Sequence, residues 1–147
     1  DGAWKKTDPQ LMQNKLSIVN QNNNVNVLNQ VRLVKYWNKR QTMPSISSYL
    51  LETLIINYYK THSFVNIKKD FRSNLAYINN SIGQPINDPN DIEGNINELD
   101  GGTIAKLKNK SYSDYLTCCD AINLEEKGEI NEAKRLWKKV FGDEFDG

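Results

Sequence analysis

The stretch that decides the fold is VRLVKYWNKRQTMPSISSYLLETLIINYY, residues 31–59, which indicates two helices separated by a short break. Apolar residues of the first helix recur every three or four positions and share one side of it: Val27, Val31, Val34 and Trp37. At about 100° per residue, Arg32, Lys35 and Lys39 fall within an arc of roughly 60° on another side. The pattern predicts a core face and a cationic flank.

The second helix follows a break at residues 41–44 and three serines, Ser45, Ser47 and Ser48. Serine suits the N-cap of a helix, because its side-chain oxygen accepts a hydrogen bond from a backbone amide that the helix leaves unpaired. Such a helix start also attracts anions, through the free amides and the aligned peptide dipoles. A cationic helix next to a helix start is a pairing that can hold polyphosphate.

The body of the second helix is predicted to be buried on most of its surface, because apolar residues surround it. One side carries Leu50, Leu51, Leu54, Ile55 and Tyr58, while Ile56 and Tyr59 lie on other sides. Tyr49 points roughly away from the leucines, so the pattern does not require it in the core.

Further helices are indicated before and after this pair. Asp8 and Pro9 form a helix start signal, as N-cap and first helical residue, and apolar residues continue at Leu11, Met12, Leu16 and Val19. A stripe at helical spacing comprises Phe71, Leu75, Ile78 and Ile82. Two C-terminal stripes, separated by Gly128, predict an antiparallel helical hairpin; they comprise Ile104, Leu107, Tyr115, Cys118 and Ile122, then Ile130, Ala133, Trp137, Val140 and Phe141.

One long irregular loop is predicted from Gly83 to Gly102, where Gly, Pro, Asn and Asp are dense. A loop of this length within a domain is usually functional or mobile, which places it near a ligand cleft. Three short segments also fit strands, Val25 to Val27, Tyr58 to Tyr59 and Phe64 to Val65, but each lies in or beside a longer helical pattern. We therefore expect an all-α bundle of about six helices.

Composition limits the classes of function. A chain of 147 residues suggests one domain. With 19 basic and 18 acidic residues the formal net charge is +1, which gives no strong signal for nucleic-acid or membrane binding, so any anion site must be local. No run approaches the roughly 18 apolar residues of a membrane span.

The cysteine and histidine content points to a reducing compartment and away from metal or triad chemistry. Cys118 and Cys119 are adjacent in a predicted helix, where they cannot readily form a disulfide, so we expect a cytoplasmic protein. His62 is the sole histidine of the sequence, which makes histidine-based metal sites and catalytic triads hard to build.

Several segments resemble the C-terminal helical lobe of the oligoadenylate synthetase and cyclic-oligonucleotide synthetase superfamily, most closely its bacterial CD-NTases. The likeness rests first on Arg32 to Trp37 and on Ser47 to Glu52, in this order and spacing. It continues at the Asp88-Pro89 loop with Gly94 and Asn95, at Trp4 to Pro9, and in a closing hairpin with Ala121, Glu125, Gly128, Ala133, Trp137 and residues 140–142. It covers nearly the whole chain, although no single motif is unique to the family.

The family's catalytic lobe is absent from this sequence. The resemblance implies an N-terminal lobe with a Gly-Ser turn and three acids that hold two magnesium ions, and the chain has no Gly-Ser dipeptide. Asp88 with Asp91, and the acids at 143, 144 and 146, lack the strand context that would aim carboxylates at metals. We therefore expect residues 1–8 to lead in from a missing lobe and residues 9–147 to form one nucleotide-binding lobe, without catalytic or metal-binding residues and inactive alone. The start at Asp1 agrees with a truncated chain.

The resemblance also implies roles for individual residues, each with a simpler alternative. Lys35 would contact the triphosphate of the donor nucleotide, or be a solvated lysine. Ser48 would cap its helix and touch phosphate, and Tyr49 would stack on the base or pack with Ile56. Arg32 and Lys39 would flank the site, although Arg32 could pair with an acid such as Glu52 instead.

The function expected from the resemblance is therefore that of a lobe that binds a nucleoside triphosphate, with Mg²⁺ or Mn²⁺ in the intact enzyme. The intact enzyme would make cyclic or linear oligonucleotide second messengers. The alternative is a stand-alone helical module that binds other proteins and no nucleotide.

Overall fold

A computed structural model of the protein describes residues 24–40, 43–87 and 94–145. These ranges contain the helices α3 (Asn24–Asn38), α4 (Ser48–Tyr59), α5 (Ile67–Ser81), α6 (Gly101–Glu126) and α7 (Ile130–Phe141). They contain no strand, apart from an isolated antiparallel bridge between Asn87 and Asn95. The all-α class is confirmed, while the helix predicted after Asp8 and Pro9 lies outside the described residues. None of these five helices is both long and apolar enough to cross a membrane.

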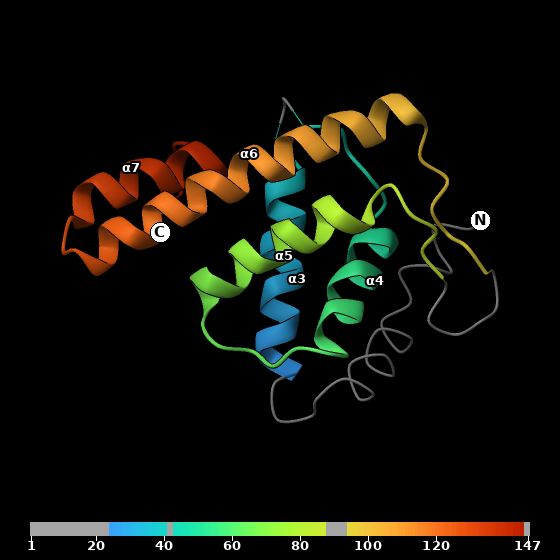
Figure 1. Ribbon diagram of the computed structural model, residues 1–147, viewed down its shortest axis with the longest axis horizontal. Coiled ribbons are helices and arrows are strands. Elements are labelled where there is room, and N and C mark those ends of the chain that lie inside the picture. The colour runs from blue at the N-terminus through green and yellow to red at the C-terminus, as the bar shows by residue number, and fades with distance from the viewer. Residues whose placement is uncertain (1–23, 41–42, 88–93, 146–147) are drawn as a thin grey trace.

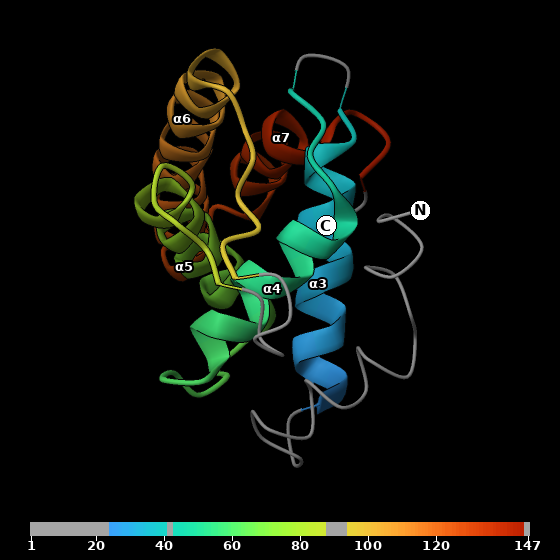
Figure 2. The same cartoon turned by 90° about the vertical axis from the view of Figure 1, so that its right-hand side faces the viewer.

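The long helix α6 forms one edge of the molecule (Figure 1). α5 packs along it, and α7 folds back beside it as the predicted antiparallel hairpin. The tight connection uses Gly128, whose φ of +83° is a backbone conformation that glycine adopts without steric cost. α3 and α4 pack against each other and against α5 (Figure 2). The helices therefore bring the end of α3 and the start of α4 to one edge of the bundle.

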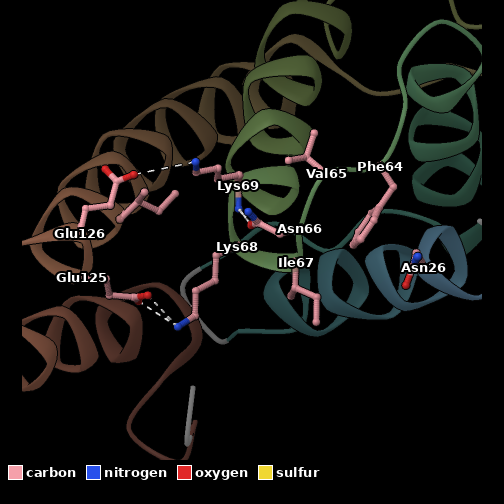
Figure 3. A pocket seen from close by; sticks show the side chains of 10 residues that line it. Asn26, Phe64, Val65, Asn66, Ile67, Lys68, Lys69, Glu125 and Glu126 are labelled. Atoms are coloured by element: carbon pink, nitrogen blue, oxygen red, sulfur yellow. Dashed lines mark hydrogen bonds and ion pairs between the residues drawn. The ribbon is translucent and has the colours of Figure 1, made fainter. Parts of the chain in front are cut away.

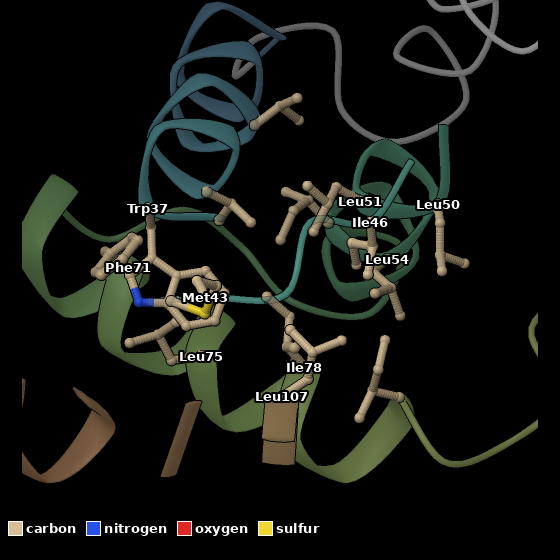
Figure 4. Packing of buried hydrophobic residues seen from close by; sticks show 14 of the residues in the cluster. Trp37, Met43, Ile46, Leu50, Leu51, Leu54, Phe71, Leu75, Ile78 and Leu107 are labelled. Atoms are coloured by element: carbon tan, nitrogen blue, oxygen red, sulfur yellow. The ribbon is translucent and has the colours of Figure 1, made fainter. Parts of the chain in front are cut away.

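The core lies between α3, α4, α5 and α6, as Figure 4 shows around Trp37, Leu54 and Leu75. Trp37 and Leu75 are 0% exposed, and full burial of one such apolar side chain contributes about 1.5 to 3 kcal/mol. On α4, every residue from Tyr49 to Ile56 is buried. The prediction of a central helix buried on most of its surface is confirmed.

The predicted loop from Gly83 to Gly102 is too long at its C-terminal end, because α6 begins at Gly101. Asp100 explains the earlier start, since its Oδ1 accepts a 2.7 Å hydrogen bond from the amide of Thr103. The described parts of the loop also have internal structure. The amide of Ile96 donates to the carbonyl of Ile86 at 2.7 Å, and the side chain of Asn97 donates to the carbonyl of Ile82.

Candidate functional site

The end of α3 and the start of α4 are tied together by Asn38. Its side-chain amide donates to the carbonyl of Pro44 at 2.8 Å, and its Oδ1 accepts from the amide of Ile46 at 3.0 Å. Asn38 is 2% exposed; its bond to Ile46 is buried and its bond to Pro44 is partly buried. The sequence does hold a signal for this residue, because a polar side chain in line with Val31 and Val34 on an apolar stripe must find partners when buried.

Ser47, and not Ser48, caps α4. The side chain of Ser47 accepts a 3.1 Å hydrogen bond from the amide of Leu50, and Ser47 has extended backbone angles. Ser48 is the first residue of the helix and is half-buried. The capping role predicted for Ser48 is therefore wrong by one residue, whereas its contact with phosphate stays a prediction.

Lys35 points at α4 and forms an ion pair with Glu52. Its Nζ lies 2.5 Å from Oε2 of Glu52, and the two side chains are 29% and 8% exposed. Glu52 follows Ser48 by four residues, which places the two on the same side of α4, one turn apart. The ammonium is therefore held beside the first turns of α4. It is not the fully solvated side chain of the alternative interpretation.

The other two predicted cations lie farther into solvent. Arg32 is exposed and donates to Oδ1 of Asn29 at 3.3 Å, while Glu52 bonds to Lys35. Lys39 is exposed as well. The helix face therefore divides into one half-buried lysine that contacts α4 and two exposed flanking cations.

Arg40, which the sequence did not single out, has a structural role at the same helix end. Its guanidinium donates to the carbonyl of Lys139 at 2.7 Å and also to that of Val140. These carbonyls end α7, and a cation there satisfies unpaired acceptors and complements the helix dipole. Arg40 therefore ties the α3 end to the C-terminal hairpin.

Tyr49 belongs to the hydrophobic core and is 4% exposed. The expectation that it need not be in the core is wrong, because α4 is covered on nearly all sides and not on the leucine side alone. A base can stack only on an accessible ring face. Stacking on Tyr49 therefore stays a prediction that requires its neighbours to move.

Lys35, Ser48 and Tyr49 do not line any of three surface grooves found on the described part of the protein. One, of about 560 Å³, includes Arg32 beside Tyr36 and Phe145. Another, of about 500 Å³, is polar and lies where Asn57, Lys60 and Gln84 meet. The candidate site at the α3–α4 junction is therefore separate from these three grooves.

The third groove, of about 590 Å³, lies between the start of α5 and the end of α6 (Figure 3). Apolar side chains such as Val65 and Ile67 line it, and ion pairs of Lys68 with Glu125 at 2.9 Å and of Lys69 with Glu126 at 3.8 Å cross it. Partial burial opposes ionisation of Glu125, but hydrogen bonds from Lys68 and Trp137 outweigh it and hold the pKa of Glu125 below its ordinary value. Each of these two lysines is thus paired with a carboxylate of α6, as Lys35 is paired with Glu52 of α4.

The described residues offer no ready metal site. Within them, no group of three or more His, Cys, Asp or Glu side chains is placed to hold an ion. The thiol of Cys118 is buried, and that burial raises its pKa, so it is held as the neutral form. The α3–α4 edge places an ammonium group one turn from the start of a helix, and both features attract anions.

No protein-family model matches the chain. Over 145 residues, 98% of its length, the chain is 37% identical to a probable cyclic nucleotide synthase of Bacillus cereus strain VD146. This similarity confirms the resemblance found in the sequence. The chain spans 44% of the length of that relative, less than half.

Proposed function

We propose that this chain is the C-terminal helical lobe of a nucleotidyltransferase that makes cyclic or linear oligonucleotide second messengers of the antiphage signalling type. In it, the α3–α4 edge holds the triphosphate of a nucleoside triphosphate. One observation carries the proposal: the Nζ of Lys35 lies 2.5 Å from Glu52, one turn from the start of α4. Lysine and helix amides are two groups that recognise phosphate. The 37% identity to a probable cyclic nucleotide synthase supports the assignment.

The rest of the reaction depends on parts of the longer enzyme. The acids and divalent ions that activate a ribose hydroxyl would come from the other lobe, because the described residues supply no metal cluster. That hydroxyl would attack the α-phosphorus and pyrophosphate would leave. Incubated alone with ATP, GTP, Mg²⁺ and Mn²⁺, the chain should form no oligonucleotide, and any cyclic or linear product would contradict this division of labour.

The binding role is tested by titrating MgATP into the chain and following backbone amide shifts. The shifts should centre on Lys35 and on residues 47–50, with dissociation constants that reach the millimolar range because half of the cleft is missing. Inorganic tripolyphosphate should produce the same set of shifts, since Tyr49 is covered and the phosphates make the main contacts. Shifts that are absent, or scattered away from the α3–α4 junction, would exclude the proposal.

The second candidate is a helical module that binds a protein. Exposed apolar side chains favour it, because Val65 and Ile67 beside the groove of Figure 3 are 71% and 56% exposed. Under this function MgATP leaves the amides of the α3–α4 junction unchanged. The same titration therefore distinguishes the two candidates.

A further inference from the structure

Glu52 is an acidic residue within the most apolar helix of the described bundle. Its neighbours Leu51 and Thr53 are buried, and its own side chain is 8% exposed. We propose that Glu52 is a positioning residue of the triphosphate site, holding the ammonium of Lys35 against the first turns of α4 so that lysine and helix amides bind one phosphate chain. This inference rests on the proposed function and assigns a residue to that same site.

Stability alone does not account for a charge at this position. Removing a carboxylate from water is costly, and replacement of a buried ion pair by well-packed apolar residues is often neutral or stabilising. A leucine at position 52 would continue the apolar surface of Leu51, Leu54 and Ile55. The carboxylate therefore contributes something that packing does not, and its partner in the structure is Lys35.

Lys35 is the more accessible member of the pair. Its side chain is 29% exposed against 8% for that of Glu52. An ammonium has three N–H donors, and the bond to Glu52 uses one of them. Two donors thus stay available to phosphate oxygens, while the bond to Glu52 restricts a side chain that is otherwise flexible.

The place to which Glu52 directs the ammonium is itself fixed. Glu52 is one turn after Ser48, Ser47 caps the helix, and Asn38 holds the preceding segment by two hydrogen bonds, one of them buried. Lysine and amides are therefore kept in one arrangement before any ligand binds. Such preorganisation reduces the entropy lost on binding.

The test is a double-mutant cycle on MgATP affinity, measured from amide shifts in the 147-residue chain. K35M should weaken binding by about tenfold, as expected for one charge-assisted hydrogen bond. In the E52Q background the same K35M change should cost less than about threefold, because an unheld lysine contributes less. Glu126→Gln, which removes an exposed carboxylate on α6, is the control and should leave the effect of K35M at its full size.

Other outcomes of the double-mutant cycle would contradict the inference. If K35M costs as much or more in the E52Q background, Glu52 is a bystander or a competitor for the lysine, and the inference is overturned. The same holds if E52Q lowers the melting temperature yet leaves the contribution of Lys35 to affinity unchanged, since that is a structural role. If MgATP produces no amide shifts at the α3–α4 junction of the wild-type chain, the proposed function and this inference both fail. Should K35M not fold, Lys35→Gln replaces it and keeps a donor for Glu52.

Discussion

Replacing Trp37 with phenylalanine should destabilise the fold by about 2 to 5 kcal/mol. Trp37 is 0% exposed, and its Nε1 donates to Oδ2 of Asp114 at 2.7 Å. The orphaned acceptor costs about 1 to 3 kcal/mol, and the space left by the smaller ring costs about 1 to 2 kcal/mol. Water cannot readily replace the donor, because the side chain of Asp114 is 5% exposed. The remaining partner of Asp114 is Lys110, 3.4 Å from the other carboxylate oxygen.

Urea unfolding measures this loss, and a slope of about 2 kcal/mol per molar converts it into a midpoint lower by about 1 to 2.5 M. Trp137→Phe is the matched control. Trp137 is 2% exposed and its Nε1 bonds to Glu125 at 2.6 Å, but the side chain of Glu125 is 24% exposed and also binds Lys68. W137F should therefore lose only the packing part, about 1 to 2 kcal/mol. Equal losses in the two variants, or a loss below about 1 kcal/mol in W37F, would refute the reasoning about the buried acceptor.

Three further predictions concern other parts of the fold. Asn38→Ala removes one buried and one partly buried hydrogen bond and should cost about 2 to 3 kcal/mol in the same unfolding assay, with the amides of residues 45–47 shifted. The pKa of Glu125 is lowered despite its partial burial, so its ionised form stabilises the fold at neutral pH, and this contribution is lost as pH falls below the ordinary value of 4.5; Glu125→Gln should flatten the acid limb of the melting temperature against pH. Gly128→Ala should lower the free energy of unfolding by about 1 to 2 kcal/mol, because the backbone φ there is +83°. Its control is Gly101→Ala, where the added Cβ meets no atom within 4 Å and the change should be neutral or stabilising.

Periodicity predicted the helices well because burial in this fold follows helix faces. Phe71, Leu75, Ile78 and Ile82 form one stripe in the sequence, and each is at most 1% exposed. The helix starts were harder to predict, because the cap Asp100 lies in a segment rich in other turn-forming residues and the cap Asn66 directly follows the apolar residues Phe64 and Val65. Local pattern specifies which side of a helix faces the core, but many polar residues compete for each boundary.

The candidate site could be predicted only in part, because the contacts that define it join different helices. Periodicity placed Lys35 on a cationic face, but nothing in the sequence pattern shows that Glu52, rather than solvent, is its partner. The burial of Tyr49 was missed for a related reason. A helix wheel describes one helix, whereas the exposure of Tyr49 depends on what covers the side opposite the leucines.

The two ends of a bound nucleotide would meet different surfaces of this chain. The phosphates would meet groups that are held in place without a ligand. Glu52 holds the ammonium of Lys35, while Asn38 and Ser47 hold the start of α4, so little rearrangement is required. For the base, Tyr49 is 4% exposed, and stacking would first have to uncover it. Under the proposed function, phosphate affinity therefore resides in this lobe as it stands. Discrimination between bases then requires either a conformation that exposes Tyr49 or contacts from the rest of the longer enzyme.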